Sequence, residues 1–462
     1  MGEPLFDKVV ILSGTSGVGL SYFRRLAERL YGDRAFIADY EDYVKDISKT
    51  GIYTVASKLL WSPNSALEVF RDAYNAMVSD AVEARRKGAR VAIIETHLSY
   101  LSVHMLIPNP VIHRMIGLGG EATIIYYLDD FYHALLRMAR YANENPKLHH
   151  VEGFIIDPLN YMAWRGLDHS LLNMLRARYS GVLEALIMSA KHGEDTHKRL
   201  LDYSVKPRLE GRREHLLAYV SHPITAIRKE YARLKQEGTL KSIAEHEFVK
   251  SFETFKRRLV RSCPSLVLFE PTTIDEISGE VGGGEDKYIV TREDRWPHER
   301  MRDYEDMYPV DIFDRETFGI IYGGSLSGQA AREAATDSIL DWDEARPYYL
   351  RRLDRMIRDQ IEVRDYEYVS QSSAVIAYEP IYRHRYIREK DKEWSPSRGV
   401  SKELARAESQ SKAIYVVAEP RAASRFVKET RGLFGEKMIP IELSDPSSPD
   451  ELLIVMRESG FC

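Results

Sequence analysis

The sequence is poor in cysteine, in net positive charge and in long apolar runs. Only two cysteines occur among 462 residues, Cys263 and Cys462, so we expect neither a disulfide framework nor a cysteine metal cluster. The formal net charge of −5 offers no general attraction for nucleic acid or an anionic membrane. No apolar run approaches the roughly 18 residues of a membrane span, and the first residues lack the pattern of a signal peptide. We therefore expect a cytoplasmic protein that binds neither membranes nor nucleic acid.

The remaining composition is that of a globular protein. Hydrophobic residues make up 44% of the chain and charged residues 29%. A chain of 462 residues is long enough for two or three domains. The sequence does not determine the oligomeric state, and a homo-oligomer is one possibility.

Short apolar runs alternate with helical patterns along the first part of the chain. Strands are predicted near 9–12, near 35–39 and at 91–94, with a helix at about 64–87 and a long helical stretch at about 158–202. This alternation indicates a doubly wound parallel sheet. Ligands bind such sheets at the carboxyl ends of the strands.

A polar stretch, "KPRLEGRREH", then separates two halves of the chain. Four more apolar runs follow it: "LLAYVSHPIT", "SLVLFEPTTIDE", "SAVIAYEP" and "KAIYVVAEP". We predict two α/β domains, each a doubly wound parallel sheet, at 1–210 and 214–462. The stretch 280–345, rich in Gly, Asp, Glu and Arg, is interpreted as an insertion in the second domain.

The stretch "ILSGTSGVGLSYF" has the form of a phosphate-binding loop that lacks its lysine. The pattern G-x-x-x-x-G-K-[ST] matches at Gly14, Gly19 and Ser21, and Leu20 stands where the lysine should be. Glycines let backbone N–H groups surround phosphate oxygens, and the following helix adds positive charge. The lysine would bridge the β- and γ-phosphates, so nucleotide binding is expected with weakened phosphoryl transfer. The alternative is a tight turn without a ligand.

The expected cofactor is Mg²⁺ with ATP or another nucleotide, with the Ser21 hydroxyl as the metal ligand. No structural metal is expected, because His97 has no second His or Cys at ligand spacing. The candidate nucleotide-binding residues are Gly14, Thr15, Ser16, Gly17, Val18, Gly19, Ser21, Glu95 and Arg137.

The first half resembles P-loop nucleoside-monophosphate kinases, especially archaeal adenylate-kinase-like proteins. The resemblance rests on "VVILSGTSGVGLS", "VAIIETHLS" and "ATIIYYLDDFYHALLRM". It implies a P-loop kinase-like fold, with Arg137 and Arg140 as phosphate ligands. Leu20 departs from the family pattern.

The second half resembles nucleoside 2-deoxyribosyltransferases and related nucleotide N-glycosidases. The resemblance rests on "AYVSHPIT", "RDYEYVSQSSAVIAY" and "SRGVSKELARA". In that family a glutamate is the nucleophile at the anomeric carbon, and the matching residue here is Glu403. Two aspartates of the family fall on Ser373 and Ser397, which is a departure.

Further candidates accompany Glu403 in the second half. His222 and Asp365 are candidate catalytic residues. The alternative for His222 is an ordinary loop histidine, and the alternative for Asp365 is an ion pair with an arginine on the face of a helix. Glu403 itself could be a solvated glutamate at a helix start. Thr and Asp after the second strand could instead cap a helix. The candidate substrate-binding residues are Tyr219, Ser221, Thr225, Glu270, Thr272, Asp275, Gln371, Gly399 and Val400.

Together these patterns predict a protein that metabolises nucleotides or nucleosides, with a nucleotide or nucleoside as its small-molecule partner. The second domain would cleave or exchange an N-glycosidic bond, and the first would bind a nucleotide. One alternative is a nucleotide sensor without catalysis. Another is a small-molecule kinase whose missing cation comes from Lys58 or Arg137.

Overall fold

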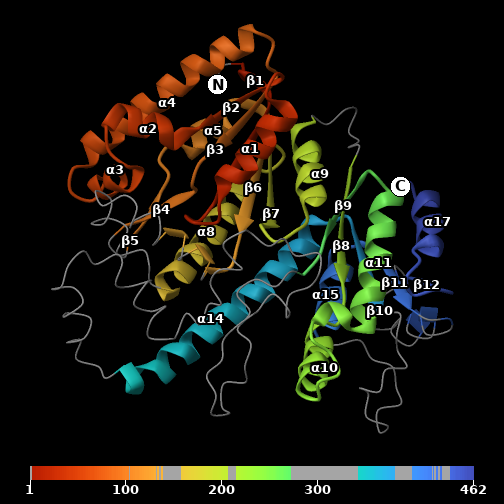
Figure 1. Cartoon of the computed structure of the whole chain (residues 1–462). Helices are drawn as coiled ribbons and strands as arrows, with labels where there is room; N and C mark the ends of the chain where they lie inside the picture. The colour runs from red at the N-terminus through yellow and green to blue at the C-terminus, as the bar shows by residue number, and fades with distance from the viewer. Residues whose placement is uncertain are drawn as a thin grey trace.

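The computed structural model describes residues 3–102, 105–131, 133–134, 137–138, 158–206, 215–271, 342–379, 398–418, 420, 423–424, 427–428 and 438–462. These residues form two five-stranded sheets with helices around them (Figure 1). Every strand pair within the two sheets is parallel. The expected fold class, two α/β units with parallel sheets, is confirmed.

The first sheet has the strand order β2-β3-β1-β6-β7. Its central strand β1 is buried along nearly its whole length, because helices cover both faces and an apolar run fits that position. The strands are β1 (Phe6–Gly14), β2 (Ala35–Asp39), β3 (Val91–Glu95), β6 (Gly119–Leu128) and β7 (Leu183–Ser189). The helices are α1 (Leu20–Tyr31), α2 (Tyr40–Ser48), α3 (Ile52–Lys58), α4 (Pro63–Arg86), α5 (Ile112–Ile116), α8 (Pro158–Arg178) and α9 (Glu194–Val205).

The second sheet has the order β12-β11-β10-β8-β9. Numbered within this unit, it is the doubly wound order 2-1-3-4-5, whose switch point lies between β8 and β10. The strands are β8 (Leu216–Ser221), β9 (Leu266–Phe269), β10 (Ala374–Glu379), β11 (Ala413–Ala418) and β12 (Met438–Glu442). The helical elements are α10 (Ile224–Gln236), η2 (Ile243–Glu245), α11 (Glu247–Ser262), α14 (Trp342–Gln371), α15 (Arg398–Ser409) and α17 (Asp450–Glu458).

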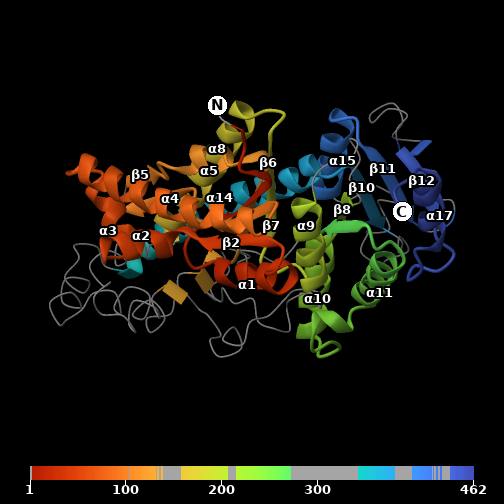
Figure 2. The same cartoon turned by 90° about the horizontal axis from the view of Figure 1, so that it is seen from above.

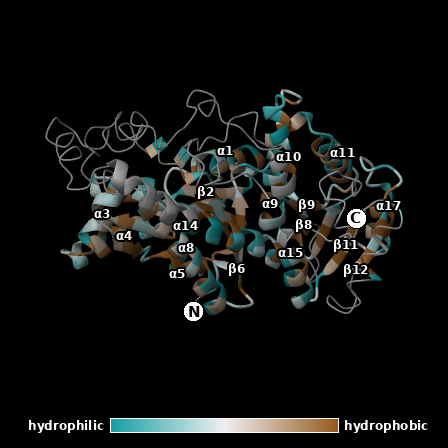
Figure 3. Ribbon diagram, turned by 90° about the horizontal axis from the view of Figure 1, so that it is seen from below, coloured by the Kyte–Doolittle hydropathy of each residue, from teal (hydrophilic) through white to brown (hydrophobic). Residues whose placement is uncertain are grey.

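The hydrophobic residues gather in the sheets. In Figure 3 the strands are mostly brown, whereas the helices alternate between brown and teal faces. This is the pattern of amphipathic helices packed on buried strands. Among the described residues, no helix is both long and apolar enough to cross a bilayer.

One sequence expectation about the fold is wrong, and some elements were not expected. The helical stretch at 158–202 is interrupted by β7, because its apolar run "LEALIMS" forms a buried strand. The hairpin of β4 (Ser99–Ser102) and β5 (Met105–Pro108) was not expected, nor was β12.

The expectation that the two cysteines stay apart is also wrong. Cys263 and Cys462 form a disulfide with a Cα–Cα distance of 5.3 Å, although 199 residues separate them in sequence. The chain's last residues pack beside the end of α11, where Cys263 Sγ also contacts the backbone oxygen of Phe461. Disulfides are rare in the cytosol of mesophiles, so the cytoplasmic location stays a prediction.

Helix α14 contacts both units. It crosses from the first sheet to the second in Figure 1, and Figure 2 shows it running between them. Its Gln371 side chain accepts from the Ile187 N–H at 2.8 Å and donates to the Ile187 carbonyl at 2.9 Å. Glu367 pairs with Arg176 at 3.1 Å. Residues 207–214 and 280–341 lie outside the described residues, so the predicted boundary and insertion stay predictions.

Candidate functional site

The loop between β1 and α1 depends on its glycines. Gly17 and Gly19 have φ angles of 80° and 79°, which side-chain-bearing residues rarely adopt. A Cβ atom on Gly17 would also lie 2.4 Å from the Ala134 carbonyl oxygen. Leu20, the first residue of α1, is only 5% exposed and belongs to the hydrophobic core. The lysine is therefore replaced by a core residue, and any cation for this loop must come from elsewhere.

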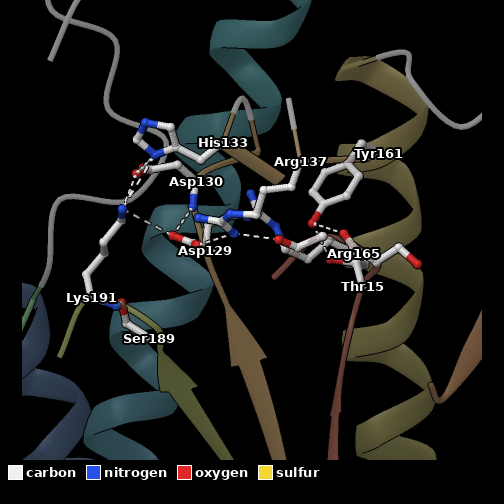
Figure 4. A network of polar contacts seen from close by, with 11 residues as sticks. Thr15, Asp129, Asp130, His133, Arg137, Tyr161, Arg165, Ser189 and Lys191 are labelled. Atoms are coloured by element: carbon white, nitrogen blue, oxygen red, sulfur yellow. Dashed lines mark hydrogen bonds and ion pairs between the residues drawn. The ribbon is translucent and has the colours of Figure 1, made fainter. Parts of the chain in front are cut away.

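Helix α8 fixes the start of the loop. The Tyr161 hydroxyl lies 2.6 Å from Thr15 Oγ1 and donates to the Ser16 carbonyl at 3.1 Å. Thr15 is 1% exposed, so its hydroxyl is committed to this contact. Figure 4 shows Tyr161 pointing at Thr15 from α8.

Two cations lie at the carboxyl edge of the first sheet, beside the loop. Arg137 donates to the Gly17 carbonyl at 2.5 Å and pairs with Asp129 at 2.7 Å. Lys191, just beyond β7, is 1% exposed and lies 3.5 Å from Asp129 and 3.3 Å from Asp130. Figure 4 shows both cations converging on the two aspartates at the end of β6. Buried charges of this kind are stable only when they are paired.

The sequence pointed to Arg137 but not to Lys191. Lys191 falls in the segment that was expected to be helical, so its place at a strand end was hidden. The apolar run "LEALIMS" followed by "AKHG" was the signal that could have revealed it. In the described residues, Arg137 contacts the loop, whereas no contact from Lys58 to the loop is found.

A group of carboxylates lies at the ends of β2 and β3. Arg24 on α1 pairs with Glu95 at 2.7 Å and with Asp39 at 3.8 Å. Burial, together with the nearby charges of Glu95 and Glu41, raises the pKa of Asp39 to about 7. Oxygen donors suit Mg²⁺, but Glu95 already has a charge partner. No group of three His, Cys, Asp or Glu side chains in the described part of the chain is arranged to hold a metal by itself, so the Mg²⁺ expected with a nucleotide stays a proposal.

Glu403 is the centre of a second polar site, in the other unit. It is 8% exposed and comes from α15, which follows β10. The Tyr219 hydroxyl donates to Oε1 at 3.1 Å, and the Ser221 hydroxyl donates to Oε2. Both donors are fully buried residues of β8. The carboxyl group thus lies at the switch point between β8 and β10, where doubly wound sheets bind ligands.

Helix α14 adds charge to this site. Asp365 pairs with Arg364 at 3.0 Å, as the simpler interpretation of Asp365 expected. Burial raises the pKa of Glu403 to about 8, and the negative charge of Asp365 contributes, while the hydrogen bonds from Ser221 and Tyr219 oppose the rise. A perturbed carboxyl group at a ligand-binding edge is a candidate functional residue.

The structure does not bring every candidate to Glu403. Gln371 is the last residue of α14, and its side chain bonds to Ile187 of the first sheet. Glu270 pairs with Lys256 at 2.8 Å. The His222 ring packs on Phe252 with centroids 4.3 Å apart. Each of these three side chains therefore has a neighbour other than Glu403.

The remaining candidates divide into two groups. Gly399 and Val400 lie in the first turn of α15, where Val400 is 1% exposed and packs in the core. Thr225 lies in α10, but its side chain is outside the described ones, and so are Thr272 and Asp275. Arg364 was missed by the sequence reasoning, since one arginine among many on a charged helix carries no signal.

Comparisons with known proteins add little to this geometry. No protein-family model matches the chain, and no curated protein is similar to it. Among solved structures, a chain from the PezAT chromosomal toxin–antitoxin system of Streptococcus pneumoniae is similar at 15% identity, over 40% of this chain and 67% of that chain. The TM-score of 0.24 is too low to support a conclusion about fold or function.

Proposed function

We propose that this protein binds a nucleoside or nucleotide and cleaves the N-glycosidic bond of that substrate, with Glu403 as the nucleophile. The observation that carries the proposal is the placement of a buried glutamate, held by Tyr219 and Ser221, at the switch point of the second sheet. The resemblance of three sequence stretches to nucleoside deoxyribosyltransferases supports the same role. A carboxylate there can attack an anomeric carbon and trap the sugar as a covalent ester.

The protein's own groups would share the step as follows. The ionised Glu403 attacks the anomeric carbon, the bond to the base nitrogen breaks, and the base leaves with a proton from solvent or substrate. Water or a second base then releases the sugar from Glu403. Because the pKa of Glu403 is raised to about 8, the reactive carboxylate fraction increases as the pH approaches that value. The Tyr219 and Ser221 hydroxyls orient the carboxylate and favour its charged form.

A second candidate function is nucleotide binding with phosphoryl transfer at the β1–α1 loop. Its support is the pair of cations, Arg137 and Lys191, at the carboxyl edge that adjoins the loop. The kinase alternative named Arg137 as one source of the cation that Leu20 removes, and a nucleotide would have to compete for both cations with Asp129 and Asp130. The sensor alternative needs the same binding without turnover.

One experiment distinguishes the three functions. The full chain is incubated with a panel of nucleosides and nucleotides, with and without Mg²⁺, and the products are separated by chromatography. Free base that disappears in Glu403→Gln supports glycosidic cleavage. A new phosphate ester with no free base supports the kinase. Binding in calorimetry without any product supports the sensor, and free base at equal rates in Glu403→Gln would refute the role of Glu403.

A further inference from the structure

Three polar side chains form a continuous chain beside the β1–α1 loop. Ser16 Oγ lies 3.0 Å from Nε2 of His97, and His97 Nδ1 lies 2.5 Å from Oε1 of Glu41. The three residues come from the loop after β1, from the segment after β3 and from the first turn of α2. A hydroxyl, an imidazole and a carboxylate in this order are the parts of an activated serine nucleophile. We call them the Ser16 relay.

The surroundings hold the relay in place. The Tyr161 hydroxyl fixes the Ser16 backbone by donating to its carbonyl at 3.1 Å. The Asn109 side chain donates to the His97 carbonyl at 2.9 Å. The His97 ring lies parallel to Trp164, with centroids 6.1 Å apart, and is 8% exposed. The geometry is therefore set by the fold before any substrate binds.

We propose that Ser16 is a nucleophile, with His97 as its general base and Glu41 as the positioning residue, and that it attacks phosphorus in a phosphate ester or anhydride. The preference for phosphorus follows from the loop, whose glycines and helix start suit a tetrahedral anion. This part of the inference rests on the second candidate function, nucleotide binding at the same loop. It is independent of the chemistry proposed for Glu403.

The step balances without a further reactant. The Ser16 hydroxyl oxygen bonds to phosphorus while its proton moves to His97 Nε2. The bond from phosphorus to the leaving oxygen breaks, and the leaving group then takes the proton from His97. The Nδ1–H of His97 remains hydrogen bonded to Glu41 throughout. The product is a phosphoserine at position 16.

His97 must be neutral to accept the proton, so the reaction depends on pH. Burial lowers the pKa of His97, but the charge and hydrogen bond of Glu41, together with the charges of Asp168 and Glu95, act in the opposite direction, and the pKa is raised overall. The groups that face His97 are Glu41 from α2, Asp168 from α8, Glu95 from β3, and the rings of Tyr53 and Tyr100. The rate should therefore rise with pH and level off above the pKa of His97. Glu41→Gln should move that rise to lower pH.

The test uses the full chain and two phosphorus probes, a fluorophosphonate and p-nitrophenyl phosphate. Peptide mass spectrometry locates the adduct, and released nitrophenol gives the rate. We expect both probes to modify Ser16, with loss of fluoride or nitrophenol, and the rate to fall at least about 100-fold in His97→Asn. His113→Asn is the matched control, because His113 lies on α5 and pairs with Tyr179 instead.

Each outcome bears on the inference. An adduct on Ser16 that is lost in His97→Asn supports it, as does the shifted pH profile in Glu41→Gln, which keeps the test valid should His97→Asn unfold. The inference would be overturned if no adduct formed, or if the adduct formed at equal rates in both histidine variants. It would also be overturned if the protein released nitrophenol from p-nitrophenyl acetate but not from p-nitrophenyl phosphate. Neither probe is a nucleotide, so calorimetry with ATP tests the second candidate function separately: nucleotide binding without any adduct would overturn the relay alone.

Discussion

Replacing Glu403 by glutamine should change the stability of the protein in favour of the variant as the pH rises, and should make the variant the more stable protein at pH 9. Glutamine keeps the size of the side chain and can still bond to Tyr219 and Ser221, but it cannot ionise. Burial in the folded protein raises the pKa of the Glu403 carboxyl to about 8, whereas a glutamate in the unfolded chain has its ordinary pKa of 4.5. The folded state therefore holds a proton that the unfolded state has lost at neutral pH.

The sign and size of the effect follow from that difference. The stability that Glu403 contributes is fully present below pH 4.5 and is lost as the pH rises through about 8. One pKa unit is worth about 1.4 kcal/mol, so wild type should lose about 4 kcal/mol relative to Glu403→Gln between pH 5 and pH 9. Because an amide has one acceptor oxygen where the carboxyl group has two, one of the two hydrogen bonds changes in the variant, which subtracts about 1 to 3 kcal/mol from its stability.

The assay is urea unfolding at pH 5, 7 and 9 for both proteins, with Glu408→Gln on the same helix as the matched control. The free-energy difference between wild type and Glu403→Gln should grow with pH, whereas the control should follow wild type. A constant difference across this range would refute the reasoning, because it would mean that Glu403 ionises as easily in the folded protein as in the unfolded chain.

Three other perturbations test the two sites and the disulfide. Asp365→Asn removes a negative charge that raises the pKa of Glu403, so the pH profile of base release should shift to lower pH; an unchanged profile would show that burial alone sets the pKa. Lys191→Met leaves Asp129 and Asp130 short of a buried cation and should destabilise the protein by about 3 to 5 kcal/mol in thermal unfolding, whereas a loss below about 1 kcal/mol would mean that water replaces the lysine. Reduction of the Cys263–Cys462 bond should cost about 2 to 4 kcal/mol, measured by unfolding with and without dithiothreitol, and a Cys263→Ser variant should not respond to the reductant.

Short apolar runs were sufficient to predict most strands of both sheets. β1, β3, β8, β10 and β11 all carry such runs, and a parallel sheet covered on both faces selects them. β7 was mistaken for helix, because helical sequence lies on both sides of it, in α8 and α9, and periodicity cannot separate a buried strand from a buried helix. β12 was not predicted; it contains Pro440, a residue that disfavours central strands but is tolerated at the edge of a sheet.

The candidate sites depend on contacts that sequence patterns do not encode. Ser221 and Glu403 were each proposed from a motif, but their hydrogen bond joins residues 182 positions apart. His97 was considered only as a metal ligand, because its partners Ser16 and Glu41 are distant in sequence. Gln371 was predicted near the same sheet edge as Asp365, whereas its side chain bonds to Ile187 of the other unit, a contact that no sequence pattern shows.

The long helix α14 explains why the two units are not independent. Near its middle, Gln360 accepts from Arg165 at 2.8 Å, and Arg165 donates to the Asp129 carbonyl at 3.0 Å, beside the first site. Little more than one turn later, Asp365 lies against the second site at Glu403. A helix is rigid over one turn, so the two sites are held at a fixed separation by the same element. A fragment that begins near residue 214 would keep α14 but would expose the face of α14 that contacts the first unit. We therefore expect that, when the chain is cut between the two units, these contacts keep the two halves associated.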